Sequence, residues 1–135
     1  MTHQRIQTDG APAAIGPYSQ AIAAGELLFC AGQVGLDPAS GQLADGFEAQ
    51  VERTLDNVGA ILAAAGLGFG DVVKTTCFLV DLADFQVFNE HYGRRFTGEA
   101  PARSTVAVAG LPRGARVEVE VVAHRPALID AIARG

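Results

Sequence analysis

An arginine and a glutamate in the last third of the chain, Arg103 and Glu118, are the side chains best suited to chemistry on a small acid. Arginine can bind a carboxylate through two parallel hydrogen bonds, and a partly desolvated glutamate can take a proton from water and return it. Both residues lie in stretches that alternate apolar and polar side chains, PARSTVAVAG and ARVEVEVVA. The pair can form a site that holds a carboxylate and activates water if the fold brings the two side chains together.

The alternation predicts that residues 103–108 and 116–122 are two strands of a hairpin, joined by a Gly-Leu-Pro turn. The valines at 117, 119 and 121 share one parity, and Glu118 and Glu120 share the other. If the valines pack beneath covering helices, the opposite face of the sheet is the charged one. We expect Arg103 on the charged face too, and Glu120 to meet Arg116 or a neighbouring chain. Two interpretations stay open: a solvated face with ion pairs worth under about 1 kcal/mol each, or a polar cleft at a subunit contact.

Two amphipathic helices are predicted in the middle of the chain. The first carries apolar residues at spacings of 4, 4, 3 and 4 from Phe47 to Leu62 and ends near Gly66, which suits a C-terminal cap. The second starts at Asp84, expected as its N-cap, and carries an aromatic stripe that we interpret as core packing. The stripe consists of Phe85, Phe88, Tyr92 and Phe96.

Further strands are predicted at residues 2–7, 18–24, 27–32 and 72–80, and the segment 36–46 reads as a loop. The order is three strands, a helix, a strand, a helix and two strands. Two helices can cover only one face of the resulting mixed sheet, so the other face needs cover of its own. The tail, residues 126–135, has the pattern of a short amphipathic helix, either docked or frayed.

Length and composition limit the class of protein. With 135 residues and 49% hydrophobic content, the chain is expected to form one compact domain over residues 1–135. A net charge of −5 argues against binding a nucleic acid backbone. The sequence shows no signal-like N-terminus or membrane-spanning run, which predicts a cytoplasmic protein without a membrane partner.

Cysteines and histidines give no sign of a metal site. Cys30 and Cys77 each lie inside an apolar run without a CxxC or Cys/His partner, so we interpret them as buried core residues. The three histidines, His3, His91 and His124, are scattered and have no ligand at helical or strand spacing. We therefore predict neither a metal nor a metal-based reaction.

Five segments, taken in order, are similar to one family. They are APAAIGPYSQA (11–21), FCAGQVGLDPASG (29–41), TLDNVGAILAAAG (54–66), VVKTTCFLVDLADFQVFNEHY (72–92) and PARSTVAVAGLPRGARVEVEVVA (101–123). Together they resemble the RidA (YjgF) family of enamine/imine deaminases. The resemblance implies a chorismate-mutase-like α/β (α+β) fold with two helices on one face of the sheet. It also implies a homotrimer with a barrel-like core, three clefts at the subunit interfaces, and no cofactor.

The resemblance also assigns roles to single residues. It implies that Arg103 binds the substrate carboxylate, that Glu118 activates water, and that Tyr18 closes the cleft. Gly32 is implied as a backbone contact, and Asn89 as a residue contributed near the pocket.

Two positions depart from the common family pattern. Ala31 stands where a serine is frequent, which removes a hydroxyl that could hold a polar substrate tail. Thr105 stands where a cysteine is frequent. A substrate contact made by the backbone N–H of Thr105 survives this change, but regulation through a reactive thiol at that position is not expected.

The implied reaction is hydrolysis of 2-iminobutanoate, 2-iminopropanoate or related 2-amino-2-enoic acids to 2-oxo acids and ammonia. Such imines already hydrolyse in water, so positioning and one acid/base group are sufficient catalysis. Alternatives are a regulatory trimer that binds 2-oxo acids without turnover, and a deaminase of another enamine such as aminomuconate or aminoacrylate peracid. Endoribonuclease activity is disfavoured by the acidic composition and the lack of a basic stripe.

Overall fold

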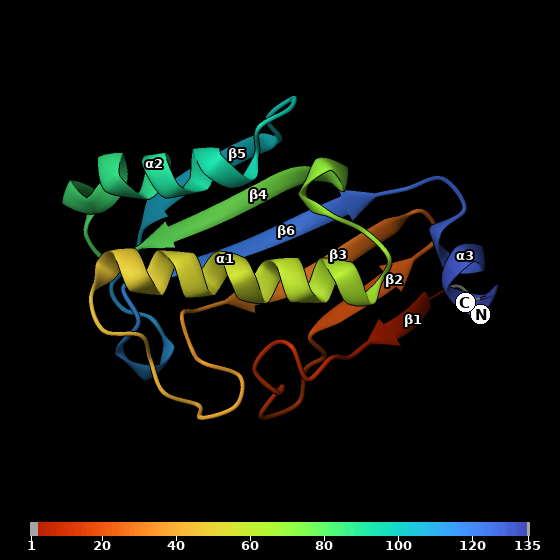
Figure 1. The fold of residues 1–135 in the computed structure, drawn as a ribbon, viewed down its shortest axis with the longest axis horizontal. Helices are drawn as coiled ribbons and strands as arrows, with labels where there is room; N and C mark the ends of the chain where they lie inside the picture. The colour runs from red at the N-terminus through yellow and green to blue at the C-terminus, as the bar shows by residue number, and fades with distance from the viewer. Residues whose placement is uncertain (1–2, 135) are drawn as a thin grey trace.

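The computed structural model describes residues 3–134 as a six-stranded mixed sheet covered by helices on one face (Figure 1). In space the strands follow the order β1-β2-β3-β6-β4-β5, and only β4 and β5 run parallel. The strands are β1 (His3–Ile6), β2 (Ala21–Ala24), β3 (Leu27–Gln33), β4 (Val72–Leu79), β5 (Ala102–Ala107) and β6 (Val117–His124). The mixed sheet and the predicted element order are confirmed; Thr2, the first residue of the predicted 2–7 strand, lies outside the described residues.

Helices α1 (Phe47–Ala64) and α2 (Phe85–Arg95) lie side by side on the same face of the sheet (Figure 1). The five residues of the predicted α1 stripe are all buried. Gly66, at a φ of 77°, donates to the carbonyl of Ala63, and Leu67 donates to the carbonyl of Leu62. These two bonds form a Schellman motif, which confirms the predicted cap because glycine adopts positive φ at little cost.

The start of α2 differs from the prediction. A single 3₁₀ turn, Leu82–Asp84, precedes the helix. Asp81 is its N-cap, and the Asp81 carboxylate accepts a hydrogen bond from the N–H of Ala83, the second residue of the turn, at 2.9 Å. The side chain of Asp84 makes no cap hydrogen bond and instead pairs with Arg116 at 2.8 Å. The capping function has moved three residues toward the N-terminus because the extra turn comes first.

The predicted hairpin between the last two strands is wrong. β4 lies between β5 and β6, pairing parallel with β5 and antiparallel with β6. The connection over residues 108–116 passes the end of β4, where Val108 donates to the carbonyl of Leu79 and Val80 donates to that of Arg116. A connection of that length exceeds a tight hairpin loop, and β4-α2-β5 is instead a parallel unit with a helical crossover.

The prediction that Arg103 and Glu118 share a face of the sheet is also wrong. Arg103 is paired in register with Thr75, which is fully buried on the helix-covered face. Glu118 is paired with Phe78 on the opposite face, while the valines of β6 pack beneath the helices as expected. Arg103 and Glu118 therefore lie on opposite faces of one sheet.

Arg116 also leaves the predicted charged face. Its guanidinium lies 5.0 Å from the centre of the Phe47 ring and bonds Asp84, so it does not meet Glu120. The open face of the sheet carries two exposed apolar side chains, Phe29 at 46% and Val106 at 43% exposure. No element among residues 3–134 covers this face, which agrees with the expectation that it needs cover from elsewhere.

The core and the tail agree with the sequence. Cys30 and Cys77 are buried, and burial raises the pKa of the Cys30 thiol to about 12 and that of Cys77 to about 11. The tail forms α3 (Leu128–Arg134), which docks beside β2 with Leu128 fully buried. Gly135 lies outside the described residues. Within residues 3–134 no helix has the length and apolar character needed to cross a membrane.

Candidate active site

Glu118 lies in a hollow of about 320 Å³ on the open face of the sheet. Tyr18 and Gly32, two more residues of the predicted site, line the same hollow. Among the described residues, the Glu118 carboxylate has no hydrogen-bond or ion-pair partner. Burial raises the pKa of this carboxyl above its ordinary value, and the nearby charge of Glu120 raises it further. A half-buried carboxylate without a partner is suited to act as a base toward a bound water molecule.

Gly32 is explained by its approach to this carboxylate. The pairing of β3 with β6 is irregular between Cys30 and Gln33, and this irregularity brings the backbone of Gly32 against Glu118. A Cβ atom at position 32 would lie 2.7 Å from the carboxyl carbon of Glu118, which is inside van der Waals contact. Only glycine leaves the Glu118 side chain in the place where the structure has it.

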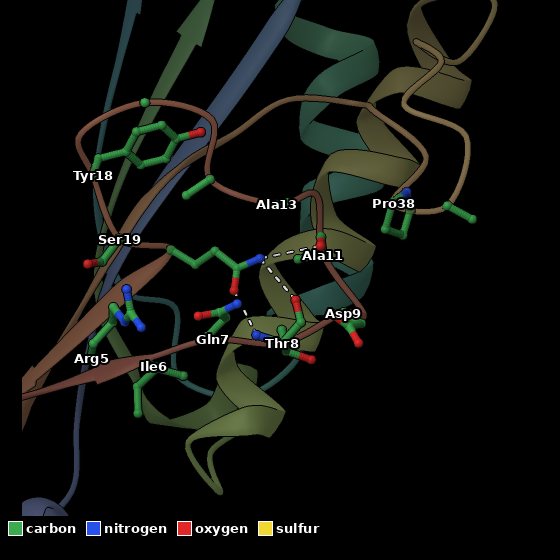
Figure 2. Close-up of a pocket in the computed structure, with 14 residues that line it drawn as sticks. Arg5, Ile6, Gln7, Thr8, Asp9, Ala11, Ala13, Tyr18, Ser19 and Pro38 are labelled. Carbon is green, nitrogen blue, oxygen red and sulfur yellow. Dashed lines mark hydrogen bonds between the residues drawn. The ribbon is translucent and has the colours of Figure 1, made fainter.

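Tyr18 lies in a loop rather than in the predicted 18–24 strand, which begins only at Ala21. The loop is fixed by the buried side chain of Gln20, which donates to the carbonyls of Thr8, Ala11 and Pro12 and accepts a hydrogen bond from the Thr8 N–H at 2.7 Å. Figure 2 shows the bonds to Thr8 and Ala11 as dashed lines. With its loop anchored in this way, Tyr18 stays 54% exposed at the edge of the Glu118 hollow.

A larger hollow of about 530 Å³ lies on the other side of Tyr18, between β1 and the loops that follow β1 and β3 (Figure 2). None of Gly32, Glu118 and Arg103 lines it. Its buried polar group, Gln20, is fully used in holding the loop. Size alone therefore does not make this hollow the site of chemistry.

Arg103 and Asn89 form the other part of the predicted site. They line a separate hollow of about 380 Å³ between α2 and the start of β5. The Nη1 atom of Arg103 donates to the Oδ1 atom of Asn89 at 2.8 Å, and the guanidinium also lies over the rings of Phe85 and Tyr92. The structure thus brings the predicted residues together in two groups, Glu118 with Tyr18 and Gly32, and Arg103 with Asn89.

Thr105 lies on the helix-covered face, paired in register with Cys77. Its hydroxyl is buried and has no hydrogen-bond partner among the described residues. The position of the family cysteine is therefore filled by a buried threonine whose hydroxyl the described residues leave unpaired. Ala31, the other departure, lies in the irregular part of β3 next to Gly32.

Two buried polar residues of α1 hold chain segments near Glu118, and neither is among the predicted site residues. Asn57 donates to the carbonyls of Val34 and Leu36, in the segment after β3 that lines the hollow. Gln50 accepts a hydrogen bond from the N–H of Arg116, just before β6. Gln50 and Asn57 each precede a residue of the apolar stripe and lie seven positions apart, so helical spacing places them on one side of α1, but it does not name their partners.

His91 is the one of the three histidines that joins a polar cluster among the described residues. Its ring nitrogens lie 2.8 Å from Oε1 of Glu48 and 2.6 Å from Oε2 of Glu52, which links α2 to α1. These hydrogen bonds, first to Glu48 and then to Glu52, raise the pKa of His91 above its ordinary value. The cluster fastens the helix that carries Asn89.

Comparison with known proteins agrees with the five matched segments. The family described as Endoribonuclease L-PSP matches residues 8–125. The chain is 50% identical over 127 residues to the mouse protein named 2-iminobutanoate/2-iminopropanoate deaminase, an alignment that covers 93% of this chain and 94% of that one. The chain belongs to the RidA (YjgF) family. Its sequence-based assignment to that family is therefore confirmed.

Another relative and two solved structures are also similar over most of the chain. Protein DfrA of Myxococcus xanthus is 52% identical over 126 residues, covering 91% of this chain and 96% of its own. Among solved structures, Escherichia coli TdcF with bound serine has a TM-score of 0.88 at 41% identity and covers 90% of this chain and 98% of its own. RidA from a Psychrobacter species has a TM-score of 0.88 at 46% identity, with coverage of 90% and 99%. The predicted fold class is thereby confirmed.

Proposed function

We propose that this RidA-family chain is an enamine/imine deaminase that hydrolyses 2-iminobutanoate and 2-iminopropanoate to 2-oxo acids and ammonia. The names of the mouse relative and of a Salmonella typhimurium relative that is 46% identical over 123 residues support this activity. The structural observation that carries the proposal is the Glu118 carboxylate, desolvated and without a partner among the described residues, in a hollow shared with Tyr18 and Gly32.

In the proposed reaction Arg103 binds the substrate carboxylate through two parallel N–H donors, a geometry that lysine does not offer. Glu118 removes a proton from a water molecule as its oxygen adds to C2 of the imine. Glu118 returns that proton to the imine nitrogen, which gives a neutral carbinolamine. It then takes the proton of the new hydroxyl and passes it to the amino group as the C2–N bond breaks, so that ammonia leaves and C2 becomes a carbonyl. The raised pKa of Glu118 brings its basicity closer to neutral pH, where proton transfer of this kind is most effective.

The proposed site is completed between subunits. Arg103 and Glu118 lie on opposite faces of one sheet, so a single chain cannot present both to one small substrate. If the edge strand β5 of one copy docks against the open face of another, Arg103 of the first meets Glu118 of the second. The exposed Phe29 and Val106 on that face support such a contact. A closed homotrimer is the assembly that we infer from it.

The proposal also covers cofactors and cellular location. No metal or cofactor is assigned, because the imine is already an electrophile and the mechanism requires only positioning and one base. Among residues 3–134 no group of three or more His, Cys, Asp or Glu side chains is arranged to hold a metal ion. A cytoplasmic location stays a prediction from the sequence, and one relative, from Arabidopsis thaliana, is named as chloroplastic.

The test is 2-oxo acid formation from imine that a pyridoxal-phosphate threonine or serine dehydratase releases in situ, with semicarbazide competing for the imine. Wild type is compared with Arg103→Ala and Glu118→Gln, after light scattering has shown the same assembly for all three. We expect acceleration by wild type and its loss in both variants. Absence of acceleration by an intact wild-type trimer would overturn the deaminase.

Measuring the binding of 2-oxobutanoate to the same three proteins by calorimetry separates the rival functions. A regulatory protein would bind 2-oxo acids without accelerating hydrolysis, and its binding would depend on Arg103 but tolerate Glu118→Gln. A deaminase of a larger enamine would use both residues but act poorly on the two imines tested. Cleavage of RNA, which the family description names, receives no support from a chain with a net charge of −5.

A further inference from the structure

We propose that Phe85 and Tyr92, two aromatic residues of α2, are positioning residues that hold the Arg103 guanidinium ready to bind a carboxylate. The inference deepens the proposed function and rests on it for the identity of the ligand. It assigns part of the aromatic stripe of α2, which the sequence analysis interpreted as core packing only, to the binding of substrate. It also gives Asn89 a role toward Arg103.

Three residues on one side of α2 contact the guanidinium. Its central carbon lies 5.4 Å from the centre of the Phe85 ring and 4.8 Å from that of Tyr92. Between them Asn89 accepts the hydrogen bond from Nη1 at 2.8 Å. The spacings of 4 and 3 residues place the three side chains on one face of the helix. Aromatic faces within about 6 Å of a guanidinium attract it, so both rings favour this position of the charge.

Tyr92 is itself held in place by the strand next to Arg103. Its hydroxyl lies 2.8 Å from the hydroxyl of Thr75, and both residues are buried. Thr75 is the register partner of Arg103 across β4 and β5. The contacts therefore form a closed circuit, from Arg103 to the Tyr92 ring, through the hydroxyl pair to Thr75, and across the strand pair back to Arg103.

Comparison with the other stacked arginines shows what is different about Arg103. Arg95 lies over Phe69 and bonds the carboxylates of Glu52 and Asp56, and Arg116 lies over Phe47 and bonds that of Asp84. Among the arginines that the structure places over a ring, Arg103 is the one with no acidic partner in residues 3–134. It has two rings and one neutral amide acceptor, and its charge is left for an anion from outside the chain.

The physical consequence is preorganisation. A free arginine loses rotamer freedom when it grips a carboxylate, and that entropy lowers the affinity. In this protein the side chain is ordered on folding, by stacking and by one of its five N–H donors, before any ligand binds. The remaining donors keep the fork geometry that a carboxylate requires.

The experiment uses full-length Phe85→Leu, Tyr92→Leu and Tyr92→Phe, with Phe88→Leu as the matched control. Phe88 lies on the same helix and is fully buried, and its ring packs on Tyr92 rather than under Arg103. Phe85 is 37% exposed, so its replacement leaves the core intact. The readouts are kcat and KM for the imine and, separately, the Kd of 2-oxobutanoate by calorimetry, which does not depend on turnover.

We expect Phe85→Leu and Tyr92→Leu to raise KM and the Kd of 2-oxobutanoate about fivefold to tenfold, with kcat changed less than about twofold. Tyr92→Phe, which keeps the ring, should restore most of the affinity lost in Tyr92→Leu. Phe88→Leu should lower the thermal midpoint and leave KM and Kd near those of wild type.

Equal values of KM and Kd in Phe85→Leu and wild type would overturn the inference, as would a Kd in Phe88→Leu weakened as much as in Tyr92→Leu. Failure of wild type to bind 2-oxobutanoate would overturn it as well. If wild type binds 2-oxobutanoate but does not hydrolyse the imine, and Phe85→Leu weakens that binding, the inference stands and only the deaminase fails.

Discussion

The two parts of the candidate site are built in opposite ways. Arg103 is braced on the helix-covered face by two rings and an amide, while Glu118 stands on the open face with no partner among the described residues. The difference follows from their proposed tasks. An anion-binding group works best when its geometry is fixed beforehand, and a base works best when little else competes for its lone pairs.

The strongest test of this division is complementation between subunits. Arg103→Ala and Glu118→Gln chains should each be nearly inactive alone. When they are unfolded together in equal amounts and refolded, about a quarter of the neighbour pairs in a randomly mixed ring should combine an intact Arg103 with an intact Glu118. We expect about a quarter of wild-type activity. Mixed assemblies as inactive as their parents would place both residues in one chain's site and break the comparison.

A second test displaces the Glu118 carboxylate by adding a methyl group beside it. In Gly32→Ala the new Cβ meets the end of the Glu118 side chain, which can swing away, so the fold should survive while the carboxylate is displaced. We expect kcat/KM to fall about 100-fold, as is usual when a catalytic group is displaced by about 1 Å. Gly70→Ala is the control, because a Cβ there has no atom within 4 Å. A Gly32→Ala enzyme with full activity would contradict the placement of Glu118.

A third test concerns the hydrogen bonds of His91, which link α2, the helix that contacts Arg103, to α1. Its folded-state pKa is raised, first by Glu48 and then by Glu52 and against the effect of Arg94 on the same helix. The charged ring therefore stabilises the fold fully below the unfolded pKa of about 6.5, and this contribution is lost as pH rises through the higher folded value.

His91→Gln should lower the free energy of unfolding by about 2 kcal/mol at pH 6 and by less at pH 9, measured with urea. The folded variant should retain its activity, because His91 lies outside the candidate site. A loss that is the same at both pH values would show that the ring stabilises by packing alone.

The smallest expected effect is on the basicity of Glu118. Desolvation raises the pKa of this carboxyl most, and the charge of Glu120 adds to it. Glu120→Gln should therefore shift the acid limb of the kcat/KM profile to lower pH, with little change at the plateau. Glu99→Gln removes an exposed carboxylate and serves as the control. A limb that stays in place would mean that burial alone sets the pKa.

The sequence predicted best what depends on local pattern. The stripe of α1 and the glycine at its end follow from helical periodicity and from the backbone freedom of Gly66, and both are confirmed. The alternation of β6 also holds, with its valines under the helices. Each of these features is decided within about 20 residues of chain by the chemistry of neighbours.

The predictions that were wrong, the last hairpin and the shared face of Arg103 and Glu118, depend on strand pairing between distant segments. Alternation shows which residues of a strand share a face, but not which face that is relative to another strand. The insertion of β4 between β5 and β6 reversed the face expected for Arg103 and separated it from Glu118. For the same reason, the sequence could not show that the site residues fall into two hollows. Gln50 and Asn57 were missed because their partners are backbone groups far along the chain.

The two buried thiols, Cys30 and Cys77, can report the local opening of the strands that contain them. With pKa values of about 12 at Cys30 and about 11 at Cys77, neither is a thiolate at neutral pH in the closed fold. A disulfide reagent should therefore modify each cysteine only during opening of the strand that contains it. Because Cys30 lies in β3 and Cys77 in β4, mass analysis of partly labelled protein can time the opening of two strands on either side of β6 without any engineered label.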